Sequence, residues 1–300
     1  AAGYVCGGHI EPRLKRQRGT VGQSEQPDGD TAVSAAQKEK CGSYDHISNC
    51  QQPIGFILAG AVTLWHNSMG MITKEMTQMS IKAVIFDLDG TLLNTLEDLT
   101  DSTNAALQQY GYPTRTIDEV RRFVGNGVKL LMLRALGIEK PEDNADFEDI
   151  FAAFRAHYAE HSNDHTRPYD GVLELMKHLW DAGIEMAIVS NKLDAAVKQL
   201  NEIYFSEYIS VAIGENEAAG VRKKPAPDTV YTALRELGVT AEQSIYIGDS
   251  EVDLATAKNS GLPCISVLWG FRDKECLLAH GAQTLCDTPE QVWETITRLH

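Results

Sequence analysis

The hydrophobic positions from residue 81 onward fall into two alternating patterns. Short, continuously apolar runs rich in β-branched residues occupy residues 81–89, 184–191, 244–250 and 263–270. Such runs are typical of parallel strands that are buried on both faces. Amphipathic stretches of helical period lie between them, at residues 171–183, 193–204, 227–238 and 251–261. This alternation predicts a doubly wound α/β fold built around a parallel sheet.

Residues 96–167 interrupt the alternation. They contain no convincing strand, but helical patterns occupy residues 96–111, 127–137 and 147–161. We therefore expect residues 81–95 and 168–300 to form the α/β core and residues 96–167 to form an inserted, all-helical cap. Ligands of open α/β folds bind at the carboxyl edge of the sheet, so an insertion after the first strand is well placed to act as a lid.

The first 80 residues have a different character. They are largely polar and show no sustained period of 2.0 or 3.6 residues, which predicts disorder. We interpret them as a leader or a non-native extension, because Met79 and Ser80 directly precede the first well-patterned strand. Their longest apolar run, residues 53–65, is too short for a membrane helix of about 20 residues. No chemistry is expected from this segment.

The charge of the chain narrows the choice of partner. The formal net charge of −15 lies entirely in residues 81–300, where 35 acidic residues oppose 20 basic ones. This excess argues against a nucleic acid or an anionic membrane as partner. The six cysteines form no C-x-x-C pair and no zinc-like spacing, so we expect reduced thiols in a cytoplasmic protein.

Polar side chains follow several of the predicted strands. Asp87 and Asp89 stand one residue apart at the end of the first strand, where each would be costly to bury without a partner. The other strand-end groups are Ser190, Asn191, Lys224, Asp249 and Asp253. Because the carboxyl ends of parallel strands meet at one edge of a sheet, these groups should gather there. Crowded carboxylates repel one another, and a divalent cation with oxygen ligands, Mg²⁺, would resolve the conflict.

A cation, a lysine and a serine hydroxyl around one point form a receptor for a phosphoryl group. Backbone N–H groups of Gly90 and Thr91, and of the helix start at Asn191, would add hydrogen-bond donors. Asp87 is then placed to attack phosphorus as a nucleophile, and Asp89 to protonate the leaving oxygen and later activate water. The two acids are needed together because they perform different steps.

Four short segments carry a family resemblance. "DLDGT", "VSN", "KPAP" and "GDSEVD" resemble, in order and spacing, the four motifs of haloacid dehalogenase-like phosphatases. The resemblance covers residues 81–300, and residues 124–137 and 248–272 are similar to bacterial phosphoglycolate phosphatases. It implies that Asp87 is the nucleophile, that Asp89 is the acid and base, and that Ser190 and Lys224 bind phosphate. It further implies a Mg²⁺ site made of the Asp87 side chain, the Asp89 backbone carbonyl, Asp249 and, ordering the shell, Asp253.

The cap offers weaker signals. Gly125, Asn126 and Gly127 are predicted to form a loop that approaches the substrate, although such a sequence also forms ordinary helix-entry turns. Lys129 and Arg134 are candidates for contacting an anionic substrate, with a solvated helix face as the favoured interpretation. The histidines spaced four apart suggest metal binding, but we favour a solvent-facing row, because no fourth ligand is evident; they are His157, His161 and His165.

The function expected from these features is Mg²⁺-dependent hydrolysis of a phosphomonoester through an aspartyl-phosphate, with 2-phosphoglycolate as the first substrate to test. The partner would be a small phosphorylated metabolite, and the protein a monomer or a homodimer. Within the same fold, a pyrophosphatase, a sugar-phosphate phosphatase or a β-phosphoglucomutase-like enzyme remains open. A non-catalytic module that binds phosphorylated metabolites is disfavoured, because the acids needed for catalysis are present.

Overall fold

A computed structural model describes residues 80–216 and 219–299. The predicted disorder of the first 80 residues falls, except for Ser80, outside the described residues. The described part contains a six-stranded sheet in the order β5-β4-β1-β6-β7-β8, and every neighbouring pair is parallel. In that order the strands are Val211–Glu215, Glu185–Leu193, Ala83–Phe86, Ser244–Gly248, Cys264–Val267 and Thr284–Cys286. The predicted parallel α/β architecture is confirmed.

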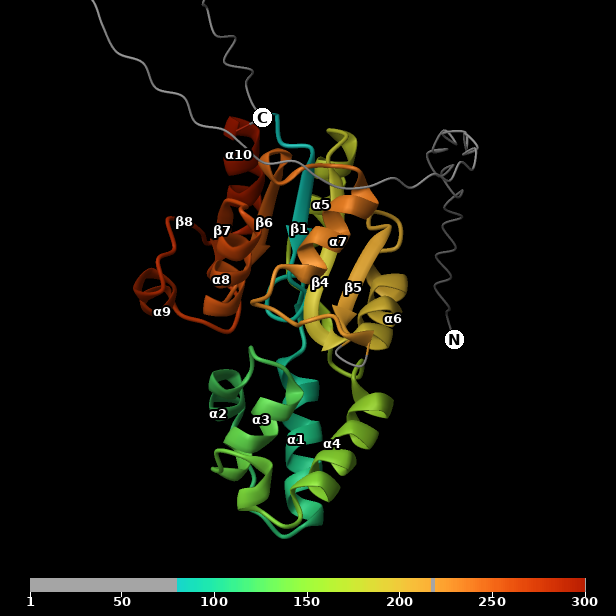
Figure 1. The fold of residues 1–300 in the computed structure, drawn as a ribbon, viewed down its shortest axis with the longest axis vertical. Coiled ribbons are helices and arrows are strands. Elements are labelled where there is room, and N and C mark those ends of the chain that lie inside the picture. The colour runs from blue at the N-terminus through green and yellow to red at the C-terminus, as the bar shows by residue number, and fades with distance from the viewer. Residues whose placement is uncertain (1–79, 217–218, 300) are drawn as a thin grey trace, which may run out of the picture. The chain divides into compact units, whose positions relative to one another are not determined.

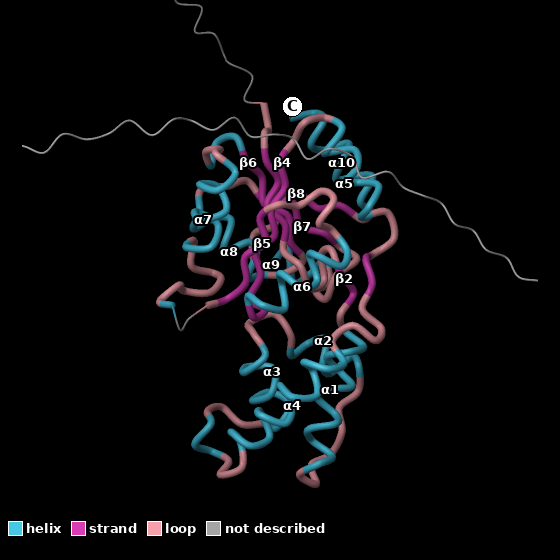
Figure 2. Tube along the Cα trace, turned by 90° about the vertical axis from the view of Figure 1, so that its right-hand side faces the viewer, coloured by secondary structure: helices cyan, strands magenta, loops and turns pink. Residues whose placement is uncertain are grey.

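Helices cover both faces of this sheet. The helices α5, α6 and α10 share one hydrophobic cluster, whereas α7 and α8 belong to another. Figure 2 shows the strands edge-on between α7 and α8 on one side and α5 and α10 on the other. The core helices, including the short α9, are Val172–Asp181, Asp194–Tyr204, Asp228–Leu237, Glu251–Ser260, Lys274–Ala279 and Pro289–Leu299. A 3₁₀ turn, Ala241–Gln243, precedes β6.

Alternation along β1 explains the two clusters. Val84 and Phe86 pack into the cluster of α5, α6 and α10, and Ile85 between them packs into the cluster of α7 and α8. Successive side chains of a strand point to opposite faces, so a strand covered on both sides must be apolar at every position. The continuous run "AVIF" therefore fits the central strand of the sheet.

Four helices follow β1 in the sequence and precede the rest of the core. They lie together beyond one end of the sheet (Figure 1), and their buried side chains form a separate hydrophobic cluster. They are α1, α2, α3 and α4, at Leu96–Gln109, Ile117–Phe123, Val128–Leu136 and Phe147–His161, with a 3₁₀ turn at Pro141–Asp143. The phenyl rings of Phe147 and Phe154 on α4 are fully buried within this cluster. We refer to this helical unit as the cap. In the described part of the chain, no helix has both the length and the apolarity needed to cross a membrane.

Two short antiparallel strands join the cap to the core. β2 (Leu93–Asn94) leads out of the core and β3 (Arg167–Pro168) leads back into it. Next to this junction, the buried Asp98 of α1 accepts hydrogen bonds from the backbone N–H of His165 and from the N–H and hydroxyl of Thr166, at 2.7–2.9 Å. Asp98 therefore ties the outgoing helix to the returning chain.

Candidate active site

The carboxyl ends of three central strands bring the predicted polar groups together. Asp87 follows β1, Ser190 and Asn191 lie in the last part of β4, and Asp249 follows β6. Together with Lys224, which precedes α7, these residues line one cavity, and cap residues of the loop between α2 and α3 line it too. The cavity thus lies where the sheet edge meets the cap.

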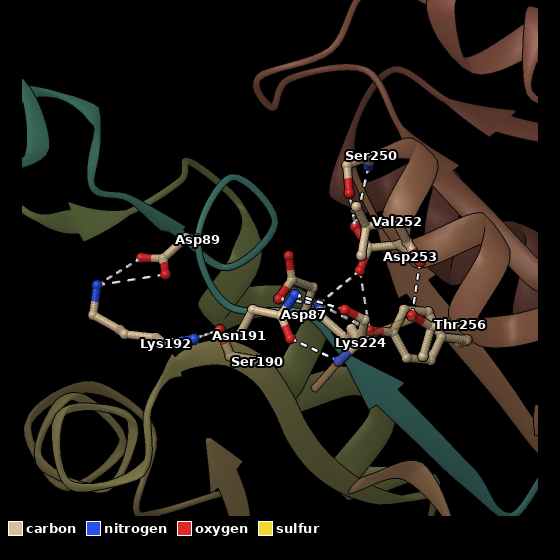
Figure 3. Close-up of polar contacts among 11 residues, drawn as sticks. Asp87, Asp89, Ser190, Asn191, Lys192, Lys224, Ser250, Val252, Asp253 and Thr256 are labelled. Carbon is tan, nitrogen blue, oxygen red and sulfur yellow. Dashed lines mark hydrogen bonds and ion pairs between the residues drawn. The ribbon is translucent and has the colours of Figure 1, made fainter. Parts of the chain in front are cut away.

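Lys224 forms the centre of the acidic cluster (Figure 3). Its Nζ lies 2.7 Å from Oδ1 of Asp87 and 2.8 Å from Oδ1 of Asp253. It also donates to the hydroxyl of Tyr246 at 3.2 Å, and that hydroxyl donates to Asp253 at 3.0 Å. Burial of the ammonium disfavours its charge, but the neighbouring Asp253 and Asp87 outweigh this effect and raise the pKa of Lys224 above its usual range. Lys224 therefore remains a cation.

Asp253 is placed by a local capping motif. Ser250 is the N-cap of α8, and its backbone N–H and hydroxyl both donate to Oδ2 of Asp253. This arrangement satisfies donors that would otherwise be left free at the start of the helix. Gly248 makes it possible, because a Cβ at that position would lie 2.3 Å from Cγ of Asp253.

Asp249 is held from the opposite side. Its Oδ2 accepts a hydrogen bond from the backbone N–H of Phe271 at 2.7 Å. Gly90 packs directly against it, with φ of 91°, and a Cβ there would lie 2.4 Å from the same Oδ2. The glycine of "DLDGT" is therefore required for the turn and for the close approach of Asp249.

The carboxylates of Asp87, Asp249 and Asp253 fit a divalent cation. Their oxygens lie within 4.8 Å of one another, and all three side chains are buried. Burial, together with the charge of Asp253, raises the pKa of Asp87 to about 7 and that of Asp249 well above its usual range. Only Lys224 directly compensates this cluster among the described ion pairs. An oxygen-only, electron-rich site of this kind suits a hard cation.

Asp89 faces away from that cluster. Both of its carboxylate oxygens accept from Nζ of Lys192, at 3.0 and 3.4 Å. The same ammonium donates to the hydroxyl of Tyr158, on cap helix α4. Lys192 was not among the candidates expected from the sequence, although a lysine within an otherwise buried strand end was a signal that could have identified it.

Only some of the predicted phosphate-binding residues line the cavity. Ser190 and Asn191 line the cavity, but the Asn191 amide is paired with the backbone of Lys224, accepting from its N–H at 2.8 Å and donating to its carbonyl at 3.1 Å. Gly90 and Thr91 are not among the lining residues, and their N–H groups bond to Leu93 and Leu88 within the turn. Their roles as phosphate donors stay predictions.

The predicted substrate loop of the cap, residues 125–127, reaches the cavity with two of its three residues. Gly125 and Gly127 line it, whereas Asn126 is not among the lining residues. Neither Lys129 nor Arg134 lines it: Lys129 pairs with Glu148 at 3.6 Å, and Arg134 donates to a backbone carbonyl within the cap.

Arg272 is a second lining residue that sequence reasoning missed. Its Nε donates to Glu251 at 2.8 Å, and its Nη atoms donate to the backbone carbonyls of Arg121 and Val124 in the cap. It follows β7 at the end of a stretch that resembles the phosphoglycolate phosphatases, but the sequence alone gave it no role. Arg272 thus connects α8 of the core to the loop that carries Gly125.

The three cap histidines have separate partners. His157 lies 3.0 Å from the hydroxyl of Ser102, and His161 lies 2.8 Å from Asp164. His165 lies near two carboxylates of α1, at 3.8 and 3.9 Å. Within residues 80–216 and 219–299, the only group of acids, histidines or cysteines with metal-binding spacing is the one at Asp87.

Comparison with known proteins agrees with this geometry. The family described as haloacid dehalogenase-like hydrolase matches residues 84–267. The phosphoglycolate phosphatase of Pseudomonas syringae pv. tomato is 32% identical over 222 residues, which cover 73% of this chain and 78% of that protein. The crystal structure of a protein provisionally named phosphoglycolate phosphatase, from Lactobacillus delbrueckii subsp. bulgaricus, is 38% identical, with a TM-score of 0.69 and coverage of 72% of this chain and 98% of that one.

A further solved structure contains a ligand. A mutant of CbbY from Rhodobacter sphaeroides, in complex with xylulose-(1,5)bisphosphate, is 27% identical to this chain. The TM-score is 0.56, and the match covers 70% of this chain and 95% of that one. The fold is therefore shared with a protein that binds a sugar bisphosphate.

Proposed function

The chain belongs to the haloacid dehalogenase-like hydrolase family and is a phosphatase, and we propose that it hydrolyses small phosphomonoesters. The reaction would proceed through an aspartyl-phosphate formed on Asp87. The observation that carries the proposal is the buried cluster of Asp87, Lys224, Asp249 and Asp253 at a cavity that the cap also lines. 2-Phosphoglycolate is the proposed substrate, since the curated relatives with about 32% identity bear the name phosphoglycolate phosphatase.

The chemistry divides between two acids. One oxygen of Asp87 is held by Lys224 at 2.7 Å, which fixes the carboxylate at the cavity for attack on phosphorus. Asp89 enters this step in its protonated form, and as the bond from phosphorus to the leaving oxygen breaks, it gives its proton to that oxygen. Asp89 then takes a proton from water, which attacks the aspartyl-phosphate and releases phosphate, returning both acids to their starting states.

Mg²⁺ is the proposed cofactor. The Asp87 and Asp249 carboxylates would hold it, with the Asp89 backbone carbonyl as a further ligand and Asp253 ordering the shell. Once bound, the ion would neutralise charge on the phosphoryl oxygens. Its charge would also lower the pKa of Asp87, which burial raises to about 7 in the metal-free protein, and so keep the nucleophile ionised.

The test is phosphate release from a panel of small phosphates, with Mg²⁺ and with EDTA, by wild type and by Asp87→Asn. The panel holds 2-phosphoglycolate, pyrophosphate, glucose 1-phosphate, glucose 6-phosphate and an aryl phosphate. We expect the highest kcat/KM for 2-phosphoglycolate and loss of turnover with EDTA and in the variant. Full activity in EDTA or in Asp87→Asn would contradict the proposed chemistry.

A sugar phosphate is the second candidate substrate. The complex of CbbY with xylulose-(1,5)bisphosphate favours it, because that protein shares this fold at 27% identity. Preference for sugar phosphates in the panel would keep the mechanism and replace the substrate. Conversion between glucose phosphates without phosphate release would indicate a mutase, and binding without turnover would indicate a non-catalytic module. The cytoplasmic location and the monomeric or dimeric state stay predictions.

A further inference from the structure

Lys192 contacts both Asp89, the proposed general acid in the core, and Tyr158 in the cap. It lies in β4, two residues after Ser190, and its side chain is only 4% exposed. Figure 3 shows Asp89 turned toward this lysine and away from Lys224, so the two buried ammonium groups serve different acids. Nζ lies 3.0 Å from one oxygen of Asp89 and 3.4 Å from the other. The lysine therefore restricts the direction in which the Asp89 carboxylate faces.

The cap completes the surroundings of this ammonium. Tyr158, on α4, accepts a hydrogen bond from Nζ of Lys192, and Nζ lies 4.7 Å from the centre of the Tyr158 ring. Both contacts favour a cation, and both exist only while α4 lies against the end of β4. Tyr158 is itself buried, so the ammonium is shielded from water on the side of the cap.

We propose that Lys192 is a positioning residue that aims the Asp89 carboxyl group at the leaving-group oxygen, and that Tyr158 makes this aim depend on the docked cap. The inference rests on the proposed function, in which Asp89 is the general acid. Proton transfer requires a short, aligned path between the acid and the leaving oxygen. A side chain held by one buried ammonium loses the rotations that would take its oxygens out of line. Undocking of α4 would remove one of the two anchors of Lys192.

If Lys192 positions the acid, the rate should depend on the leaving group. p-Nitrophenyl phosphate releases a stable anion that needs little protonation, whereas phenyl phosphate releases a more basic oxygen that does need it. Neither aromatic ring carries an ionised substituent, such as the carboxylate of 2-phosphoglycolate, that Lys192 could bind directly. If the acid is no longer positioned, the hydrolysis of phenyl phosphate should therefore slow much more than the hydrolysis of p-nitrophenyl phosphate. The quantity to compare is kcat/KM, which reports on the steps up to phosphoryl transfer.

The experiment measures kcat/KM for both aryl phosphates with wild type, Lys192→Met and Tyr158→Phe. Lys198→Met is the matched control, because the Lys198 side chain is exposed and forms an ion pair with its helix neighbour Asp194 at 2.6 Å. For Lys192→Met we expect a loss on the order of 100-fold with phenyl phosphate and less than about 10-fold with p-nitrophenyl phosphate. Tyr158→Phe keeps the ring and should show the same ordering with a smaller loss, of about 3- to 10-fold.

A double variant separates positioning from a structural role. In an Asp89→Asn background there is no acid to aim, so Lys192→Met should cause no further loss with p-nitrophenyl phosphate. Equal losses for the two esters, or additive losses in the double variant, would overturn the proposal. A rise in KM confined to 2-phosphoglycolate would also overturn it, by making Lys192 a ligand for the substrate carboxylate. If Lys192→Met does not fold, Tyr158→Phe alone carries the leaving-group test.

The result also distinguishes this inference from the proposed function. Wild-type turnover that is lost in Asp87→Asn, together with unchanged Lys192→Met, would retain the function and reject the role of Lys192. Absence of turnover by wild type with every ester would reject both.

Discussion

Lys224 and Asp253 form a buried ion pair, with Nζ and Oδ1 2.8 Å apart. Asp253 is anchored by the N-cap of α8, and Lys224 is anchored through its backbone by Asn191. The pair joins two strand-end loops and leaves the same ammonium 2.7 Å from Asp87. A buried cation that is shared by two acids is costly to remove, because each acid then remains in the interior without a partner.

Replacing Lys224 by Met should therefore abolish most of the activity. We expect kcat to fall by at least about 100-fold, because the phosphoryl group loses its nearest cation and Asp87 loses the contact that holds it. Steady-state kinetics with saturating Mg²⁺ would measure this. Lys223→Met is the adjacent control and should retain activity within a few-fold; similar losses in both variants would contradict the assignment.

Metal binding should become more stabilising as pH rises. The pKa of Asp87 is raised to about 7 in the folded, metal-free protein, against about 3.9 for an unperturbed aspartate. The stability that this proton contributes is present at low pH and is lost as pH rises through about 7. Mg²⁺ competes with the proton, so its effect on Tm should be larger at about pH 8 than at about pH 6.

Thermal denaturation with Mg²⁺ and with EDTA at the two pH values measures this difference. Without metal, the Asp87→Asn variant should lose less stability than wild type between the lower and the higher pH, because the carboxyl group that titrates is gone. An increase in Tm on adding Mg²⁺ that is independent of pH would show that these carboxyl groups do not bind the ion.

Gly90→Ala should disrupt the proposed Mg²⁺ site through geometry alone. The new Cβ would lie 2.4 Å from Oδ2 of Asp249, so that carboxylate must move. Gly111 offers a control: its φ is 75°, but a Cβ there would meet nothing within 4 Å. We expect Gly111→Ala to cost about 1 kcal/mol of stability without changing Mg²⁺ dependence. Gly90→Ala should raise the Mg²⁺ concentration needed for half-maximal activity by at least about 10-fold, and an unchanged value would exclude Asp249 as a ligand.

Asp98 should matter for stability of the junction between cap and core. It is 1% exposed and accepts three hydrogen bonds from His165 and Thr166. Removing it in Asp98→Ala leaves buried donors unpaired, and we expect the free energy of unfolding to fall by about 2–4 kcal/mol in urea denaturation. Asp101→Ala, one turn along α1 at an exposed side chain, should change it by less than about 0.5 kcal/mol. Equal effects would mean that the three hydrogen bonds contribute little.

Local patterns were sufficient to predict the central strands and the acids that follow them. Asp87, Asp89 and Asp249 stand next to apolar runs, so the direction of the strands places them at one edge. The strands β5 and β8 were not predicted, because runs as short as "VAIGE" and "TLC" carry little periodic signal.

The contacts of Lys192 and Arg272 illustrate what one sequence does not reveal. Lys192 meets Tyr158 across 34 positions, and Arg272 meets Val124 across 148, so both depend on how the cap lies on the core. By contrast, the missed helix α2 had a local signal: Thr116 and Glu119 form a capping box.

The identity of the phosphorylated residue shows most directly whether Asp87 is the nucleophile. In Asp89→Asn, p-nitrophenyl phosphate needs no acid to leave, but the base that activates water is missing, so the phosphoenzyme should accumulate. Mass spectrometry of acid-quenched, digested protein should locate one phosphoryl group on Asp87, and none when Asp87→Asn is added. Release of p-nitrophenol with an equal amount of phosphate and unmodified Asp87, or a phosphoryl group on another residue, would contradict the account.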